Sequence, residues 1–240
     1  MERKIESELK NLKGRILEMG GYVEQAIDMV TKALHDRDVT SLSGVRAIEH
    51  KVDDAHVAID NACVELLARQ SPFAADLRLI IAIIKINTDL ERMGDQAMNI
   101  SYNADHYLKE SRIDVADDLS KMGVAVKSMV RMALDAFMKQ DVTMAQQVLE
   151  ADDEVDGYKN AMFRHLIPYM KNDPSTVESA LDLILIARNL ERMGDHATNI
   201  AEDVIFACTG EDVRHGGNRG DVNQAGGQAG GTLSGKGQKP

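Results

Sequence analysis

A near-identical internal repeat is the feature that most limits what this 240-residue chain can fold into. Residues 90–100 read LERMGDQAMNI and residues 190–200 read LERMGDHATNI, so nine of the eleven positions are identical at an offset of 100. A weaker match pairs residues 51–53 with residues 154–156 at an offset of 103. A period of this kind indicates a duplicated structural unit. The difference between the two offsets predicts a longer connection in the first copy, near RQSPFAADLR at 69–78.

The composition favours helices over strands, because Pro occurs only four times and aromatic residues make up 4% of the chain. Turn signals, chiefly Asp and Pro, divide the chain into six predicted helices: 3–37, 39–70, 73–110, 114–140, 141–172 and 174–209. Short connections make consecutive helices antiparallel. We therefore predict an all-α fold of two tandem antiparallel three-helix bundles, residues 1–112 and 113–210. Residues 211–240 hold half of the eighteen glycines and are predicted to be a disordered Gly-rich tail.

The charge and the apolar runs limit the partners of the chain. A net charge of −11 argues against nucleic acid and suits cations or a basic partner surface. The longest apolar stretch, LIIAIIKI at 79–86, is too short to span a bilayer, and MERKIESELK at the N-terminus lacks the apolar segment of a signal peptide. Cys63 and Cys208 form no CxxC motif and are predicted to be reduced core residues. We expect a soluble, cytoplasmic protein.

Both copies of the repeat carry the same two stripes on a helical wheel of about 100° per residue. One stripe is apolar and is predicted to face the core: Leu90, Met93, Ala97 and Ile100 in the first copy, and Leu183, Ile186, Leu190, Met193, Ala197, Ile200 and Val204 in the second. The other stripe is polar and is predicted to face outward: Glu91, Asp95 and Asn99 in the first copy, and Glu191, Asp195 and Asn199 in the second.

A second acidic pair with the same spacing of four occurs on another helix of each half. Glu49 and Asp53 flank an apolar stripe of Val45, Ile48, Val52 and Ile59, and Asp152 and Asp156 are their counterparts. Like charges one turn apart destabilise a helix, and a bound cation removes that repulsion. Oxygen-rich sites suit Mg²⁺, Ca²⁺, Mn²⁺ or iron. The glycine before the last Asp of each repeat, at 94 and 194, costs about 1 kcal/mol relative to Ala but allows close approach of a backbone or a ligand shell.

Other interpretations of these residues stay open. Arg92 and Arg192 are expected to screen their acidic neighbours, and His196 is a candidate metal ligand whose counterpart, Gln96, argues against a symmetric role. The acidic stripes could also be the solvated faces of a plain helical scaffold. A carboxylate-bridged di-metal enzyme of the ferritin-like kind needs inward Glu residues and E-x-x-H pairs, and the repeat contains no such pair. The seven His residues form no arrangement with Ser or Cys, so we predict no enzymatic activity.

The tandem helical pattern, with NTDLERMGDQAMNI at 87–100 and ARNLERMGDHATNI at 187–200, resembles the PhoU family of bacterial and archaeal phosphate-uptake regulators. The resemblance extends over about residues 5–209. It implies a homodimer of helical bundle pairs and negative regulation of phosphate uptake and of the phosphate-starvation response, the Pho regulon. It also implies an adaptor between the ATPase subunit of a phosphate ABC transporter and a phosphate sensor histidine kinase, which reaches the membrane only through these partners.

The resemblance further implies that metal ions, with Mg, Mn, Zn or Fe as candidates, bind at the E/D-x-x-x-D motifs. The implied ligands are Glu49, Asp53, Glu91 and Asp95 in the first half and Asp152, Asp156, Glu191 and Asp195 in the second, with Asn99 and Asn199 as further candidates. Asp152 stands where the first half has Glu49, and its shorter side chain is expected to weaken or rearrange the second site. The Gly-rich tail lies outside the family pattern.

Overall fold

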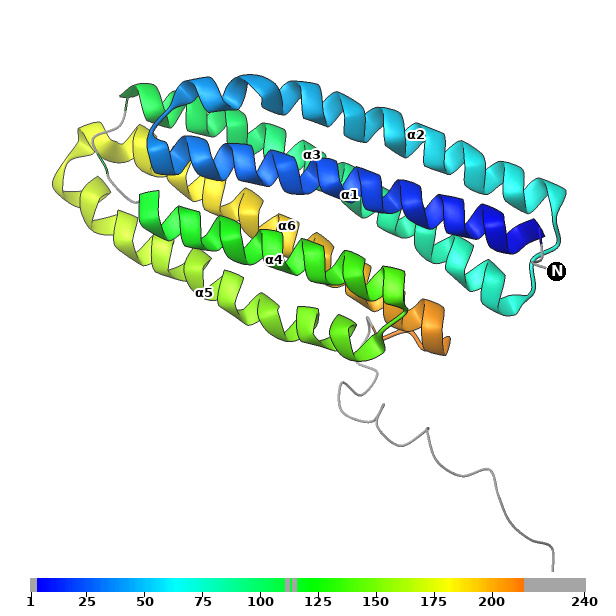
Figure 1. Ribbon diagram of the computed structural model, residues 1–240. Coiled ribbons are helices and arrows are strands. Elements are labelled where there is room, and N and C mark those ends of the chain that lie inside the picture. The colour runs from blue at the N-terminus through cyan, green and yellow to red at the C-terminus, as the bar shows by residue number, and fades with distance from the viewer. Residues whose placement is uncertain (1–3, 111–112, 114–115, 214–240) are drawn as a thin grey trace, which may run out of the picture.

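The computed structural model describes residues 4–110, 113 and 116–213 (Figure 1). Within them the chain forms six long helices: α1 (Lys4–Asp36), α2 (Val45–Arg69), α3 (Ala74–Glu110), α4 (Ala116–Lys139), α5 (Val142–Asn172) and α6 (Val177–Thr209). Two short 3-10 helices, η1 (Val39–Gly44) and η2 (Pro174–Thr176), precede α2 and α6. The described residues contain no strand, and the predicted all-α fold is confirmed. The predicted tail lies outside the described residues except for 211–213, which are not helical.

The starts of α2 and α6 differ from the prediction. The segments 39–44 and 174–176, predicted to be α-helical, are 3-10 helices instead. An aspartate precedes each of them: Asp38 Oδ1 accepts the N–H of Thr40 at 2.9 Å, and Asp173 Oδ1 accepts the N–H of Ser175 at 2.9 Å. Such capping holds the chain in a tight turn before the α-helix begins.

The connection from α1 to α2 has the same geometry as the connection from α4 to α5. Arg37 and Gln140, 103 residues apart, both adopt left-handed backbone conformations, with φ of 52° and 53°. In each case the N–H of the following aspartate reaches back to an alanine carbonyl, Ala33 or Ala136, at 3.0 Å. Asp141 also caps α5, because its Oδ1 accepts the N–H of Met144 at 3.0 Å. The duplication therefore extends to the turns as well as the helices.

The next connection is where the two halves begin to differ. The helices α2 and α5 end at residues 69 and 172, still 103 apart. Residues 70–73 then connect α2 to α3, whereas residue 173 alone connects α5 to η2. The longer connection predicted for the first half is seen only up to η2, because the connections between the α-helices, 70–73 and 173–176, both span four residues.

The two halves pack side by side around one continuous apolar core (Figure 1). The helix α3 lies against α6 and α1 lies against α4, whereas α2 and α5 contact only helices of their own half. Every residue of the predicted apolar stripes is buried: Val45, Ile48, Val52, Ile59, Leu90, Met93, Ala97, Ile100, Leu183, Ile186, Leu190, Met193, Ala197, Ile200 and Val204. The outer helices α2 and α5 are thus held at the flanks of a shared core.

Ion pairs also join the two halves along α3 and α6. Lys85 Nζ on α3 lies 3.1 Å from Oδ1 of Asp203 on α6, a carboxylate whose side chain is only 3% exposed. Further along, His106 Nδ1 lies 2.5 Å from Oδ2 of Asp182. A buried carboxylate is costly without a partner, so Lys85 and Asp203 help to fix how α3 aligns with α6.

The crossing of α1 and α4 depends on two glycines related by the repeat. Leu134 of α4 lies so close to Gly20 that a Cβ at that glycine would collide with its side chain. Likewise, a Cβ at Gly123 of α4 would collide with Oγ1 of Thr31 on α1. The helix α1 is continuous through Gly20 and its neighbour Gly21. Gly20 is a packing site, whereas a Cβ at Gly21 would meet nothing within 4 Å.

The thiols and the apolar helices agree in part with the expectations from the sequence. Both cysteines are free, and Cys63 is fully buried as predicted. Burial raises the pKa of the Cys63 thiol to about 11. Cys208 is only half-buried near the end of α6, with Sγ 3.6 Å from the carbonyl oxygen of Gln140. Across the helices that the structure describes, none is long and apolar enough to span a bilayer.

The two adjacent glycines of α1 provide a test of the α1–α4 crossing. Gly21→Ala should raise the free energy of unfolding by roughly 1 kcal/mol, because Ala is the better helix former. Gly20→Ala gains the same helix propensity but forces Leu134 to move, at a cost of roughly 1 to 3 kcal/mol for overpacking. We expect thermal unfolding to show a higher Tm for Gly21→Ala and an unchanged or lower Tm for Gly20→Ala. Equal increases for both variants would contradict the packing role of Gly20.

Candidate metal centres

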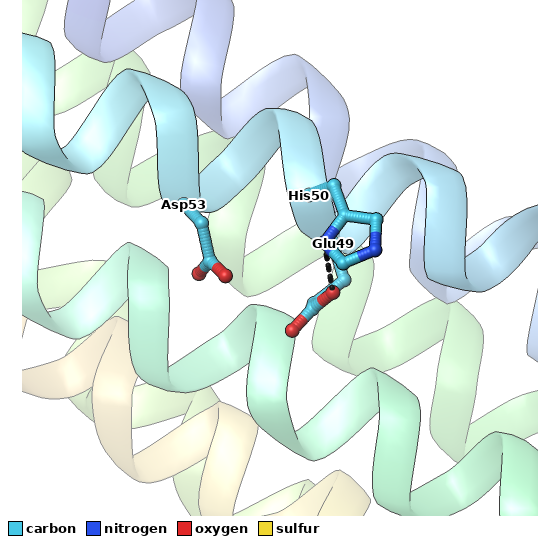
Figure 2. Close-up of side chains that lie close together, drawn as sticks. All are labelled: Glu49, His50 and Asp53. Atoms are coloured by element: carbon cyan, nitrogen blue, oxygen red, sulfur yellow. Dashed lines mark ion pairs between the residues drawn. The ribbon is translucent and has the colours of Figure 1, made fainter.

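The first acidic cluster is built around Glu49 and Asp53 on α2, with Asp95 on α3 near enough for its charge to act on Glu49, and with Glu91 one turn before Asp95 on α3. Figure 2 shows the carboxyl groups of Glu49 and Asp53 pointing from α2 toward the neighbouring helix. One ligand atom each from Glu49, His50 and Asp53 can lie within 4.8 Å of one another, a spacing that suits a shared metal ion. The sequence predicted Glu49 and Asp53 as ligands, and His50, whose Nδ1 lies 3.3 Å from Glu49 Oε2, is an additional candidate.

The α3 carboxylates of this cluster are bridged by an arginine. Arg92 Nε lies 3.4 Å from Glu91 Oε2, and Arg92 Nη1 lies 3.5 Å from Asp95 Oδ2. The arginine side chain is 56% exposed, so the solvent screens both interactions. As expected, Arg92 screens its two acidic neighbours, and it does so from the solvent-exposed edge of the cluster.

Burial and the charges of neighbouring carboxylates both act on the pKa of Glu49. Its pKa is raised above the ordinary value, first by burial and then by the negative charges of Asp53 and Asp95, with His50 and Arg46 acting in the opposite direction. The effect of Asp95 places this carboxylate of α3 near Glu49 of α2. Oxygen donors at this spacing suit a hard divalent cation.

Gly94 determines how closely the two helices of this seam approach. A Cβ at Gly94 would lie 3.1 Å from Cγ1 of Val52, which is tighter than an ordinary contact. Val52 is fully buried and stands one residue before Asp53, so the glycine lets α2 settle against α3 beside the acidic pairs. The close approach at this glycine is therefore made by a valine side chain of α2, not by the backbone or ligand shell expected from the sequence.

The second acidic cluster comprises Asp152 and Asp156 on α5 with Glu191 and Asp195 on α6. Unlike the first cluster, it contains a lysine. Lys159 Nζ lies 2.6 Å from Asp156 Oδ1 and 2.6 Å from Glu191 Oε1, and so links α5 to α6. These two hydrogen bonds raise the pKa of Lys159 above its ordinary value, against the opposing effect of desolvation, so the side chain is an ammonium.

The other two carboxylates of the second cluster show the effect of uncompensated charge. The pKa of Asp195 is raised to about 6, first by desolvation and then by the charges of Glu191, Asp152 and Asp156, with His196 acting against them. The pKa of Asp152 is also raised, first by burial and then by the neighbouring carboxylates. Asp152 Oδ1 would be 3.6 Å from a Cβ at Gly194, so this shorter side chain lies directly against α6. Lys159 therefore contacts Asp156 and Glu191 directly and acts on Asp152 only through its charge, so the pKa values of Asp152 and Asp195 stay raised.

The predicted outward orientation of the acidic stripes is only partly correct. The side chains of three glutamates are largely covered, with exposed fractions of 20% for Glu49, 23% for Glu91 and 19% for Glu191. Asp95 and Asp156 are more open, at 42% and 49%. A single-helix wheel ignores the neighbouring helix, and α2 and α5 cover one side of each stripe. The clusters therefore lie in seams between helices rather than on a free surface.

The two asparagines of the polar stripes lie apart from the acidic clusters. The side chain of Asn99 is exposed, and its backbone carbonyl accepts a hydrogen bond from Asn103 Nδ2 at 2.7 Å. Asn199 Nδ2 instead donates to Asp89 Oδ1 on α3, at 3.2 Å. His196 Nδ1 lies 2.8 Å from the same oxygen. Asn199 and His196 are thus engaged across the α3–α6 interface, on a carboxylate that the sequence did not single out.

Sequence reasoning missed His50 and Lys159, although the repeat contains a signal for both. At the offset of 103, Lys159 aligns with His56 and His50 aligns with Asp153, so the charges around the two clusters differ at these positions. Lys159 also follows Asp156 by three residues, a spacing at which side chains of one helix meet. Both His50 and Lys159 stand at positions where the two copies differ, whereas the common motif contains neither of them.

This duplicated three-helix unit, with an acidic cluster at the outer seam of each copy, defines a class of all-helical tandem-repeat proteins distinct from ferritin-like bundles, whose carboxylates face inward. Within that class the chain belongs to the PhoU family. The model of the PhoU domain matches residues 16–104 and again residues 119–204.

Similar proteins are known in sequence and in structure. The chain is 38% identical over 216 residues to the phosphate-specific transport system accessory protein PhoU homolog of Pseudomonas aeruginosa, covering 90% of this chain and 89% of that protein. It is 35% identical over 209 residues to the protein of that name from Serratia marcescens, covering 87% and 86%. The crystal structure of PhoU from Pseudomonas aeruginosa matches with a TM-score of 0.83 over 87% of this chain and 100% of that chain, at 38% identity. The phosphate transport system regulatory protein PhoU from Streptococcus pneumoniae matches with a TM-score of 0.81 at 29% identity, over 88% and 99%.

The raised pKa of Asp195 predicts a pH-dependent stability. The folded chain holds this proton up to about pH 6, whereas the unfolded chain releases it near pH 4. Between these values the folded state binds more protons, so its stability falls as the pH rises. Asp195→Asn removes the penalty, so the Tm of the variant should equal that of the unsubstituted chain below pH 4 and exceed it by a few degrees at most above pH 6.

A matched control separates this effect from a general loss of negative charge. Asp54→Asn makes the same change at an exposed position of α2 outside the second cluster, and the difference in Tm from the unsubstituted chain should not change over the same pH range. Thermal unfolding followed by circular dichroism at several pH values measures both variants. A pH-independent shift for Asp195→Asn would contradict the prediction.

Proposed function

We propose that this chain is an accessory regulator of phosphate uptake without catalytic activity of its own. The single observation that carries the proposal is family membership over both repeats, together with relatives that are named phosphate-specific transport system accessory proteins and align with about nine-tenths of the chain. The architecture supports it, because the core between the six helices is apolar and the carboxylates lie at its edges. A di-metal enzyme would need those carboxylates inside the bundle.

In this proposal the protein represses phosphate uptake and the Pho regulon as a cytoplasmic homodimer. It links the ATPase subunit of a phosphate ABC transporter to a phosphate sensor histidine kinase, and it meets the membrane only through these partners. The net charge of −11 favours a basic docking surface on the partner over nucleic acid. Association steered by such charges weakens as salt increases.

Metal binding at the first acidic cluster is part of the proposal. Glu49, Asp53, Glu91 and Asp95 would hold the ion, with Mg, Mn, Zn or Fe as candidates. A divalent cation suits this site because the carboxylates offer oxygen donors and because the negative charges of Asp53 and Asp95 act on Glu49. The ion would supply positive charge at the seam. The ligand side chains would keep α2 aligned with α3. The shape of this face would then depend on whether the metal ion is bound.

Metal binding should be visible as thermal stabilisation. With Mn²⁺ at about 100 times its Kd, the folded state gains roughly 2.7 kcal/mol, which raises the Tm by roughly 5 to 10 °C. Asp95→Asn should lose this increase and should also be more stable than the unsubstituted chain without metal, because one repelling charge is gone. Asp54→Asn is the control and should keep the metal-dependent increase. Absence of any increase in the unsubstituted chain with Mn²⁺, Mg²⁺, Zn²⁺ or Fe²⁺ would favour a plain helical scaffold.

The regulatory role is tested in the source organism. Deletion of the gene should raise phosphate uptake and the expression of a Pho-regulon reporter in phosphate-replete medium, and the unsubstituted gene should restore both. The tagged protein should recover the transporter ATPase and the sensor kinase in a pull-down at high phosphate, identified by mass spectrometry. Unchanged uptake and unchanged reporter expression after deletion would refute the proposal.

A further inference from the structure

We propose that the two acidic clusters are functionally different: Lys159 is a built-in cation that occupies the second cluster, so that divalent metal ions bind only at the first. The proposal rests on the proposed metal binding of the first cluster. It concerns which half of the duplicated chain remains open to a metal ion, and it makes Lys159 the residue that determines this selectivity.

The geometry around Lys159 is that of an ion held by ligands. Its Nζ lies 2.6 Å from one carboxylate oxygen on each of the two helices, Asp156 on α5 and Glu191 on α6. Both are residues expected to bind a metal. The lysine side chain is only 21% exposed and that of Glu191 only 19%, whereas that of Asp156 is 49% exposed, so the contact with Glu191 lies within the seam and the contact with Asp156 lies at its edge. Charge-assisted hydrogen bonds at this distance are among the strongest available to a side chain.

The ammonium and a divalent cation compete for the same oxygens. Divalent ions bind carboxylate oxygens at about 2.0 to 2.6 Å. An ion bound to the oxygens that Lys159 contacts would therefore lie no farther than about 5 Å from its Nζ. Positive charges at that separation repel strongly in a partly covered seam. A metal ion can enter the second cluster only if the lysine moves away and gives up both hydrogen bonds.

The first cluster has no equivalent obstacle. The position aligned with Lys159 is His56, whose Nε2 lies 3.6 Å from Asp60 and whose Nδ1 lies 3.4 Å from the carbonyl oxygen of Asn87. That histidine faces away from the acidic pairs, toward the next turn of α2 and toward α3. Beside the first cluster, the guanidinium of Arg92 and the imidazole of His50 belong to side chains that are 56% and 69% exposed, and the charge of Arg46 also acts on Glu49. Arg92 lies at its edge and can swing into the solvent when a metal ion binds, whereas His50 is itself a candidate ligand.

Mn²⁺ binding measured by equilibrium dialysis tests the proposal. The unsubstituted chain is compared with Asp95→Asn, Asp195→Asn and Lys159→Gln. A fourth variant, Lys139→Gln, is the matched control, because this lysine pairs with Asp135 at an exposed position outside both clusters. Circular dichroism confirms the helix content of each variant.

We expect Asp95→Asn to lower the affinity for Mn²⁺ by at least about tenfold and Asp195→Asn to leave the number of bound ions and their affinity unchanged. Lys159→Gln should bind additional Mn²⁺, and adding Asp195→Asn to it should remove the additional binding. Lys139→Gln should behave as the unsubstituted chain.

The other possible outcomes contradict either the role of Lys159 or metal binding at the first cluster. If Asp195→Asn lowers Mn²⁺ binding while Lys159 is present, both clusters bind metal and the role assigned to Lys159 is wrong. Unchanged binding by Lys159→Gln would also overturn it. If the unsubstituted chain binds no Mn²⁺ but Lys159→Gln does, metal binding at the first cluster is wrong while the role of Lys159 stands. No binding by any variant would refute both.

Discussion

The burial of α3 against α6 is the contact on which the rest of the molecule depends. Their apolar stripes, including Leu90, Met93, Leu190 and Met193, belong to one core that runs through both halves without a break. A three-helix unit alone would leave these faces in water. Once α3 and α6 are paired and α1 crosses α4 at Gly20, the remaining helices α2 and α5 can pack only at the flanks. Each acidic seam therefore forms on the outer side of its own half.

The sequence was sufficient for the parts of the fold set by periodic burial and by local turns. Every predicted core residue of the repeat is buried, because a period of 3.6 specifies one face of a helix directly. Asp38, Asp141 and Asp173 signalled the turns because their side chains cap the following N–H groups. The 3-10 starts before α2 and α6 were missed, since the same residues permit either helix type and the choice is made by packing.

The candidate site was predicted less completely, because it depends on contacts between helices. The wheel placed Glu49, Glu91 and Glu191 outside, yet the neighbouring helix covers most of each side chain. The engagement of Asn199 and His196 by Asp89 was not predictable, since these residues meet only when α3 aligns with α6. The repeated motif directed attention to what the halves have in common. The two halves differ in how the carboxylate charge is compensated. The first cluster has the solvent-facing Arg92, and the second has the largely covered ammonium group of Lys159.

The two glycines of the repeat have unequal freedom to vary. A methyl group at Gly94 would press on the fully buried Val52, whereas one at Gly194 would meet Val155 at 3.5 Å, an ordinary contact. After a gene duplication, both copies begin under the same restrictions. Here the first copy keeps a tight steric requirement, and the second can exchange its glycine for alanine at little steric cost. Among descendants of this chain, amino-acid substitutions should therefore accumulate faster at position 194 than at position 94.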